Sequence, residues 1–542
     1  MATDMATDTV MATRLPETPW LTGKHVGAPL MPEVVPIFLP PVFCCMGLAC
    51  VLLSGNAVAQ AVAGPAPAIS IVPRISVSER LTNNIGLAST GKKSEQITTI
   101  SPGISIRSNG GRLKGTLDYS LNELIYARGT SSRQSQNALS SSAVWEAVDN
   151  FAFVDFTGAI SQQSISALGV QSVDGSSVNG NSTETSTFRL SPYLKGRLGG
   201  IADYEARYGW ASSRSDASTT SDILTTDASL RLTGAVRGGP LGWGMDASTQ
   251  KVKYSLGRTA SSDRLGGSLS YAFTPQFNAS LLISRESNNY TTAANQSHAS
   301  AGLSLNWRLS DRTTIAAQLQ NHSYGQSHDI SFQHRTARTA WRFSDSRAVS
   351  NSPAQSGQTS LGSLSDLLFS QFTSLEADPL KRAELVNRYI QENGLTANTP
   401  VISNFLSSQV SLQRRQEASF ALLGVRDTIS FVLSRGSNTS LGNFVTAFDD
   451  LSTNTVINQS GVSVVYSHRL TPDTSMSAVV SRQSSSGSGG QSGTRLRAVD
   501  LSISSRLGRQ MSASIGARRV FFESATNPYT ESAVTGNLNV QF

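Results

Sequence analysis

Basic residues recur at alternate positions in several segments, where their charge could act on anions. Arg189, Lys195 and Arg197 alternate with apolar residues such as Leu190 and Leu194. In a strand, this period of two places the basic side chains on one face and the apolar ones on the other. Five more residues occupy equivalent positions: Arg207, Arg231, Arg308, Arg506 and Arg518. If this face borders a water-filled lumen, its charges focus a positive potential and concentrate anions there.

Acidic residues fall on the same predicted face, which leaves a second interpretation open. Asp203, Glu205, Asp246 and Asp500 also point inward in this pattern. Carboxylates between basic residues form ion-pair ladders that brace a wide barrel. The inward face is therefore either a cationic lumen or a wall whose charges neutralise one another.

Signatures of enzymatic chemistry are weak. No segment matches a phosphate-binding loop, an H-E-x-x-H zinc helix or a G-x-S-x-G elbow. His322, His328 and His334 lie near one another with Asp329 beside them, so a barrel-embedded hydrolase of the Ser/His type is one hypothesis. Serine is so abundant that such proximity arises by chance. We predict that the protein is not an enzyme and has no catalytic residues, cofactor or metal site.

The elements that must position these side chains are strands. Alternation recurs about every 12 to 15 residues from about residue 68 to the end; for example, Leu303, Leu305, Trp307 and Leu309 share one face. Each segment has the length of a tilted strand that crosses a membrane. Backbone groups in lipid must all be paired, so such strands require a closed barrel. We predict an all-β fold, a transmembrane antiparallel up-and-down β-barrel of about 20 strands.

The connections alternate between short turns, such as 198–200, and longer Ser/Asn/Gly loops, such as 163–184 and 436–457. Short periplasmic turns and longer external loops are usual in such barrels. About 21 strands can be counted, whereas single-chain bacterial barrels have an even number. Either one strand is miscounted, or residues 344–407 run through the lumen from one side to the other.

One insertion, residues 346–407, interrupts the strand pattern. Apolar residues recur at helical spacing from Leu364 to Leu375, and a second helix follows Asp378 and ends at Gly394. We predict two helices over about 363–395. They form a periplasmic decoration, a plug or a partner-docking element, whose docking face would be Leu385, Val386, Tyr389 and Ile390.

The N-terminus carries an export signal. Residues 35–53 are apolar and are followed by small residues, which is typical of a signal peptide cleaved after Ala59 or Ala61. A transmembrane anchor is the alternative, but three prolines in this segment favour cleavage. Residues 1–60 are then an N-terminal extension and signal peptide, and 61–542 the barrel. All three cysteines, Cys44, Cys45 and Cys50, would be removed with the signal.

The last strand points to the compartment. Val534, Gly536, Leu538, Val540 and Phe542 fall on one face. A final strand that ends in Phe resembles the terminal strand of bacterial outer-membrane β-barrels, in which Leu538, Val540 and Phe542 would form the signal for the barrel-assembly machinery. We predict location in the bacterial outer membrane, in contact with its lipid. No basic run with interleaved aromatic residues is present, so nucleic acid is not expected as a partner.

Six segments together resemble a family of uncharacterised outer-membrane β-barrels associated with the PEP-CTERM/exosortase exopolysaccharide system: 75–79, 101–105, 117–121, 421–428, 461–474 and 529–542. The resemblance implies a location and a genomic setting, without an activity. The leading hypothesis is a porin-like barrel that supports passage or secretion of a polar or anionic glycan, with anionic polysaccharide and periplasmic export components as partners. The alternative is a non-conducting scaffold that docks an export machinery.

Overall fold

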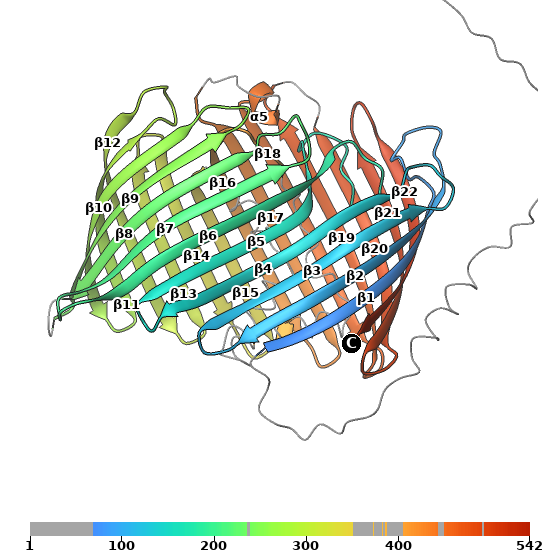
Figure 1. The fold of residues 1–542 in the computed structure, drawn as a ribbon, viewed down its shortest axis with the longest axis horizontal. Helices are drawn as coiled ribbons and strands as arrows, with labels where there is room; N and C mark the ends of the chain where they lie inside the picture. The colour runs from blue at the N-terminus through green and yellow to red at the C-terminus, as the bar shows by residue number, and fades with distance from the viewer. Residues whose placement is uncertain are drawn as a thin grey trace, which may run out of the picture. The chain divides into compact units, whose positions relative to one another are not determined.

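The computed structural model describes residues 69–235, 239–350, 372, 382, 385–386, 405–442, 449–489 and 493–542. Within this part, 22 strands form one antiparallel sheet in which each strand pairs with its neighbours in sequence (Figure 1). β22 pairs with β1, for example Leu538 with Val77, and so closes the sheet into a barrel. Closure leaves no strand with an unpaired edge. The predicted fold class is confirmed.

The strands are β1 (Ile69–Thr82), β2 (Glu95–Asn109), β3 (Leu113–Tyr126), β4 (Gln134–Val148), β5 (Ala152–Ser164), β6 (Ser182–Leu198), β7 (Ala202–Ser215), β8 (Ile223–Ala235), β9 (Leu241–Tyr254), β10 (Ala260–Thr274), β11 (Phe277–Asn288), β12 (Gln296–Ser310), β13 (Thr313–His322), β14 (Gly325–Arg335), β15 (Thr339–Ser350), β16 (Ser411–Leu423), β17 (Asp427–Ser440), β18 (Val456–Arg469), β19 (Thr474–Gly487), β20 (Thr494–Arg506), β21 (Met511–Glu523) and β22 (Tyr529–Gln541). A short helix, α5 (Asp450–Thr453), lies between β17 and β18.

The two ends of the barrel differ in the length of their connections. One end carries short turns, such as 199–201 between β6 and β7, together with the start of β1 and the end of β22. The other end carries the longer connections, such as 165–181 between β5 and β6. In barrels of this kind, short turns face the periplasm and longer loops face the exterior.

The structure has 22 strands, an even number, which removes the conflict between the roughly 21 strands counted in the sequence and the even number usual in such barrels. β15 ends at Ser350 and β16 begins at Ser411, and both residues lie at the long-connection end. The interpretation in which residues 344–407 cross from one side to the other is therefore wrong, and the count of about 21 was one strand short. β13 and β14 are joined at this end by only two residues, 323–324, which breaks the expected alternation of lengths.

The insertion and the N-terminus fall largely outside the described residues. β15 includes residues 346–350, so the non-barrel segment begins later than predicted. The predicted signal peptide and nearly all of residues 351–404 are not described, although Arg382, Leu385 and Val386 are helical. In the part of the chain that the structure describes, no helix is both long and apolar enough to cross a membrane.

The outer face of the barrel is apolar. Large side chains such as Leu265, Ile283 and Ile515 are 60% or more exposed on it. So large an apolar surface is unfavourable in water and matches the hydrocarbon of a bilayer. Aromatic side chains gather towards the short-turn end, where the Phe277 ring lies 5.3 Å from Phe273 and 5.9 Å from Trp307, centroid to centroid. This agrees with an interfacial aromatic girdle.

Candidate functional site in the barrel lumen

A row of acidic and basic side chains crosses the inner face of the wall formed by β5 to β11. Nη1 of Arg207 lies 2.6 Å from Oδ2 of Asp155, and its Nε lies 3.2 Å from Oε1 of Glu205. Arg231 on β8 stands in register between Glu205 on β7 and Asp246 on β9. Strand pairing thus aligns charges of alternating sign, because cross-strand partners point to the same face.

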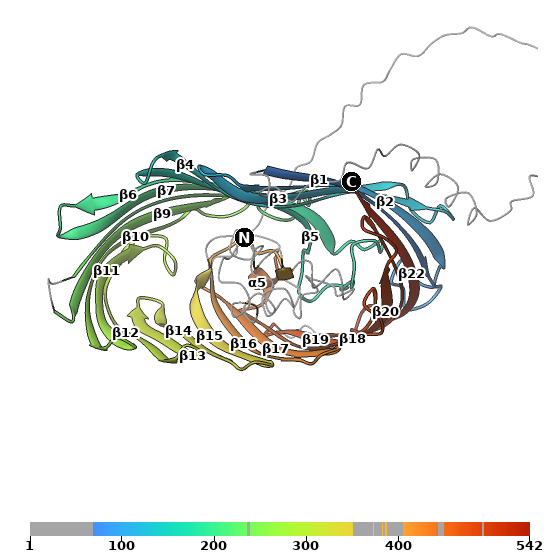
Figure 2. The same cartoon turned by 90° about the horizontal axis from the view of Figure 1, so that it is seen from below.

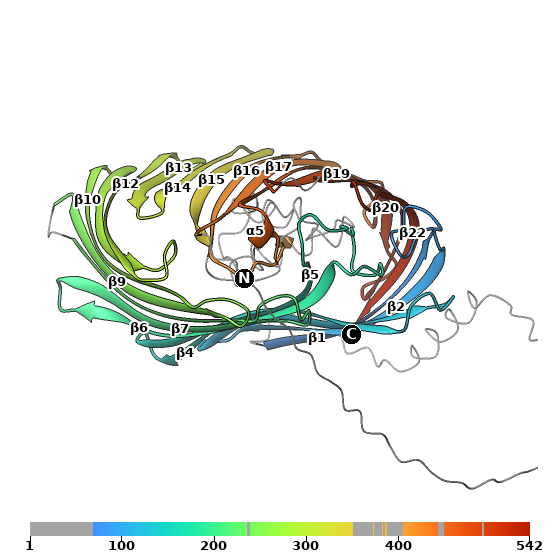
Figure 3. The same cartoon turned by 90° about the horizontal axis from the view of Figure 1, so that it is seen from above.

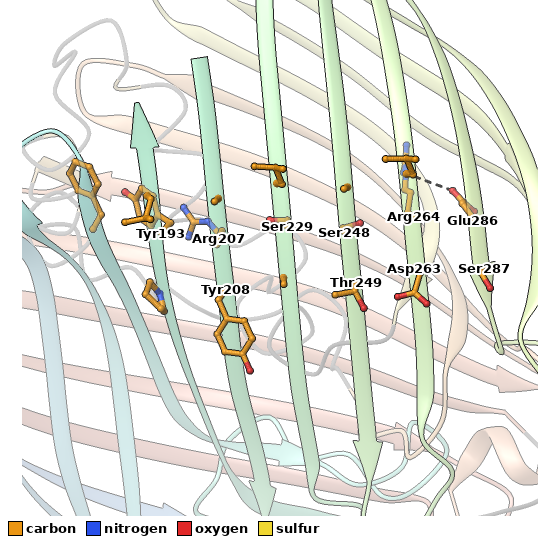
Figure 4. Close-up of a pocket in the computed structure, with 18 of the residues that line it drawn as sticks. Tyr193, Arg207, Tyr208, Ser229, Ser248, Thr249, Asp263, Arg264, Glu286 and Ser287 are labelled. Carbon is orange, nitrogen blue, oxygen red and sulfur yellow. Dashed lines mark ion pairs between the residues drawn. The ribbon is translucent and has the colours of Figure 1, made fainter. Parts of the chain in front are cut away.

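The row continues towards β13. Nε of Arg264 lies 3.5 Å from Oδ2 of Asp246, and its Nη1 lies 3.9 Å from Oε1 of Glu286. Figure 4 shows this wall, with Arg207, Arg264 and Glu286 in the row. We call the set the charge ladder: Asp155, Glu205, Arg207, Arg231, Asp246, Arg264 and Glu286. A pocket of about 930 Å³ lies along this wall, and residues of its inner and outer faces line the pocket.

Two aromatic rings lie at one end of the charge ladder. Phe153 and Tyr193 stack with their centroids 5.1 Å apart. Nζ of Lys195 lies 4.1 Å from the centroid of the Phe153 ring. The guanidinium carbon of Arg207 lies 4.1 Å from the centroid of the Tyr193 ring. Such cation–π contacts hold flexible basic side chains against the wall.

The structure places all eight predicted basic candidates on the inward face. Four of them form ion pairs with carboxylates: Arg189 with Asp227, Arg197 with Asp203, Arg207 with Asp155, and Arg518 with Asp174. Lys195 lies on a ring, as described above. For this part of the set, the geometry agrees with the interpretation of a wall whose charges neutralise one another.

Two of the remaining candidates, Arg231 and Arg308, differ from these. Arg231 and Arg308 are exposed to the lumen, and neither has an ion pair with any residue that the structure describes. Arg506 ends β20 at the short-turn end and is also exposed. Arg231 and Arg308 are therefore the inward cations most available to a solute.

The loop between β5 and β6, residues 165–181, folds into the lumen, and we call it the inner loop. Its apolar residues pack on three parts of the wall. Val170 and Val173 join a cluster with Val520, Val178 joins one with Ile97, and Ala167 joins one with Leu451 of α5. Figures 2 and 3, which look along the barrel, show this loop and α5 inside the ring of strands.

Ion pairs fix the centre of the inner loop. Oδ1 of Asp174 lies 2.6 Å from Nη1 of Arg80, and its Oδ2 pairs with Arg518. Arg80 also pairs with the buried Glu531 on β22. Burial raises the pKa of Asp174, but the guanidinium groups of Arg518 and Arg80 outweigh this effect and hold the pKa well below its usual range. Asp174 therefore remains charged at neutral pH.

Further contacts join the inner loop to α5 and to residues 405–410. Asp450 accepts hydrogen bonds of 2.6 Å from the Ser166 hydroxyl and the Ala167 backbone N–H. Asp449 accepts one of 2.7 Å from the Ser408 N–H, and the Ser408 hydroxyl accepts one of 3.2 Å from the Ser221 N–H. These links cross the lumen near the long-connection end, and a cavity of about 80 Å³ lies among residues of both walls there. Sequence reasoning missed this arrangement.

The three histidines do not converge on one site. His328 lies on the outer face, with Nε2 3.0 Å from Oδ1 of Asp345, and His334 bonds to Thr313. His322 instead faces the lumen. Its Nδ1 lies 2.8 Å from both carboxylate oxygens of Glu286, and its Nε2 lies 2.7 Å from the Ser327 hydroxyl. Glu286 lies two strands away, so no local signal in the sequence pointed to it.

The predicted docking face is only partly described. Val386 is 1% exposed and Leu385 is partly buried, so neither offers an open apolar surface. Tyr389 and Ile390 lie outside the described residues.

No protein-family model matches the chain, and no curated protein matches it in sequence. Among solved structures, the chain is similar to the siderophore receptor PirA from Pseudomonas aeruginosa at 10% identity, covering 87% of this chain and 80% of that one, with a TM-score of 0.43. It is also similar to the FrpB iron transporter from Neisseria meningitidis (F5-1 variant, apoprotein form) at 8% identity, covering 87% and 81%, with a TM-score of 0.48.

The barrel itself decides the location. Its strands close on themselves, its outer face is apolar, and aromatic rings gather at one edge. Such a surface is stable only in a bilayer, and closed barrels of this kind span the bacterial outer membrane. The protein is an outer-membrane β-barrel. Its charged inner wall and its inner loop are the features on which a function must rest.

Proposed function

We propose that the barrel supports passage of a polar or anionic glycan through its lumen. The observation that carries the proposal is the exposed, charged inner wall. The side chains of Arg197 and Asp203 are 82% and 64% exposed although they pair with each other. A glycan offers hydroxyl donors and acceptors together, and a wall of alternating charge offers partners for both.

In this proposal, the lumen discriminates only weakly between solutes of different charge. Most inward basic residues are neutralised by neighbours, so the wall favours polar solutes without holding them tightly. Arg231 and Arg308 supply unpaired positive charge, which biases the lumen towards anions. Passage is non-covalent, and release is fast because each contact is weak.

The resemblance to exopolysaccharide-associated barrels supports a glycan as the solute. In that setting, anionic polysaccharide and periplasmic export components are the proposed partners. The inner loop then acts as an internal restriction that such a partner or solute must displace.

Single-channel conductance of the mature chain in planar bilayers tests the proposal. We expect a measurable, mildly anion-preferring conductance. The double variant Arg231→Gln/Arg308→Gln should shift the anion-to-cation permeability ratio by about twofold, whereas Arg285→Gln on the outer face should leave it unchanged. Equal selectivity in all three proteins would contradict a role for these lumen cations.

A flux assay addresses the solute itself. Proteoliposomes that contain the barrel should release an anionic oligosaccharide faster than empty liposomes do. A barrel that is folded, silent in bilayers and inactive in flux would overturn the transport proposal and favour the non-conducting scaffold.

A further inference from the structure

The outer face of β15 to β21 carries a band of arginines near the long-connection end. These arginines point outward because each shares its face of the strand with an exposed apolar residue two positions away, as Arg435 does with Leu433 and Arg482 with Val480. We call seven residues the arginine band: Arg347, Arg414, Arg435, Arg482, Arg495, Arg497 and Arg519. The same stretch of outer face holds two carboxylates, Asp345 and Glu523.

Like charges face each other directly within the band. Arg482 on β19 is the cross-strand partner of Arg497 on β20, and Arg347 on β15 is the partner of Arg414 on β16. Like charges in this arrangement destabilise a sheet. The repulsion is relieved when an anion binds between the two guanidinium groups.

The two carboxylates neutralise only part of the band. Glu523 accepts hydrogen bonds of 2.9 Å from Arg495 and 2.7 Å from Arg497. Asp345 accepts bonds of 3.1 and 2.7 Å from Arg414. Within the described part of the chain, Arg435 and Arg482 have no ion pair, so the centre of the band keeps its positive charge.

The depth of the band corresponds to a membrane interface. Arg482 lies near Gly487, where β19 ends, and Arg497 lies near Thr494, where β20 begins. At about 3.3 Å per residue, both arginines lie within about 20 Å of these strand ends, which form the long-connection end of the barrel. Apolar Val480, Val499 and Leu501 follow directly on the side towards the bilayer centre, each at least 39% exposed. The band therefore lies where charged headgroups meet hydrocarbon.

We propose that the arginine band binds the phosphate groups of a phosphorylated glycolipid in the outer leaflet. Guanidinium groups bind phosphate through paired, charge-assisted hydrogen bonds, and two opposed arginines embrace one phosphate. The acyl chains of the lipid then lie on the apolar side chains below. This binding site is on the outer wall and is independent of the proposed passage through the lumen.

Binding of lipid A to the barrel extracted from outer membranes tests the assignment. Native mass spectrometry in detergent would count bound diphosphoryl lipid A. We expect Arg482→Gln/Arg497→Gln to weaken binding by about tenfold or more, because two charge-assisted contacts are lost. The matched control is Lys251→Gln/Lys253→Gln, which removes two outward cations at the same end of β9, and it should bind as the parent does.

Two further ligands separate a lipid site from a site for free phosphate. Lipid A without phosphates should bind the parent as weakly as diphosphoryl lipid A binds the arginine variant. Inorganic pyrophosphate should not displace bound lipid; if it binds the parent strongly by itself, the band serves a soluble ligand and the lipid assignment fails. Equal affinity of parent and arginine variant for diphosphoryl lipid A would also overturn it.

Migration of the unheated barrel on gels confirms folding, and Arg482→Gln alone serves if the double variant misfolds.

Discussion

The carboxylate of Asp174 lies 2.6 Å from the guanidinium of Arg80, so β1 holds a loop that leaves the wall at β5. Arg518 on β21 pairs with the same carboxylate from the other side of the seam between β1 and β22. Closure of the barrel and position of the inner loop are thus coupled through one residue. Whatever displaces Asp174 releases the inner loop and leaves Arg80 and Arg518 to share the single carboxylate of Glu531.

Asp174→Asn should therefore open the lumen. The substitution keeps the size of the side chain but removes the charge that attracts both arginines, and loss of one partner from a part-buried ion pair is costly. We expect a larger or more frequently open conductance in planar bilayers than in the parent. Asp216→Asn, at an exposed residue directly after β7, is the control and should behave as the parent does. An unchanged conductance would show that the apolar contacts alone hold the loop.

Acid should release the inner loop only at low pH. The pKa of Asp174 is lowered in the folded protein. Its ion pairs with Arg80 and Arg518 therefore stabilise the inner loop in full at every pH above the ordinary Asp pKa of about 3.9. Its contribution is lost as the pH falls below that value towards the lowered pKa. We expect the difference in conductance between parent and Asp174→Asn to stay constant from about pH 8 to about pH 4.5. A difference that disappears near pH 6 would contradict the assigned ion pairs.

The wall was predictable because its signal is local. Alternation of residues such as Leu303 and Ser304 indicates which side chains face lipid, and in the structure Arg231 and Arg308 lie on the opposite, inner face. The parity of the strands was not predictable with the same certainty. Only two residues, Ser323 and Tyr324, separate β13 from β14, so nothing in the composition marks a connection there.

The inner loop was not predictable, because its contacts join residues far apart in the chain. Its serines and glycines resemble those of an external loop, and it was expected to be one. Asp174 is 94 residues from Arg80 and 344 from Arg518. Val170 and Val173 find their apolar partners only once the barrel is closed. Periodicity describes one strand at a time and cannot reveal contacts between a loop and strands far away in the sequence.

Removal of Phe542 should reduce assembly into the outer membrane. The Phe542 N–H donates a hydrogen bond of 2.9 Å to the Pro73 carbonyl, at the seam where β22 meets β1, and the residue is 61% exposed. We expect a several-fold lower yield of folded barrel in outer-membrane fractions from the truncated chain. Phe521→Ala, which removes another exposed ring from β21, is the control. Equal yields would rule out Phe542 as part of an assembly signal.

Ser327 should not act as a nucleophile, although its hydroxyl lies 2.7 Å from Nε2 of His322 and that imidazole lies 2.8 Å from Glu286. Residues of these three types in this order are also found in hydrolases. Here the His322 ring is stacked under Tyr324, with centroids 4.8 Å apart and planes 6° from parallel, and the residue is 8% exposed. A general base so covered has no room for a substrate beside it. We therefore expect a fluorophosphonate probe to leave the folded barrel unlabelled, and Ser327→Ala to behave as the parent in conductance. Labelling that Ser327→Ala abolishes and His328→Ala preserves would instead show that Ser327 is an activated nucleophile and contradict this prediction.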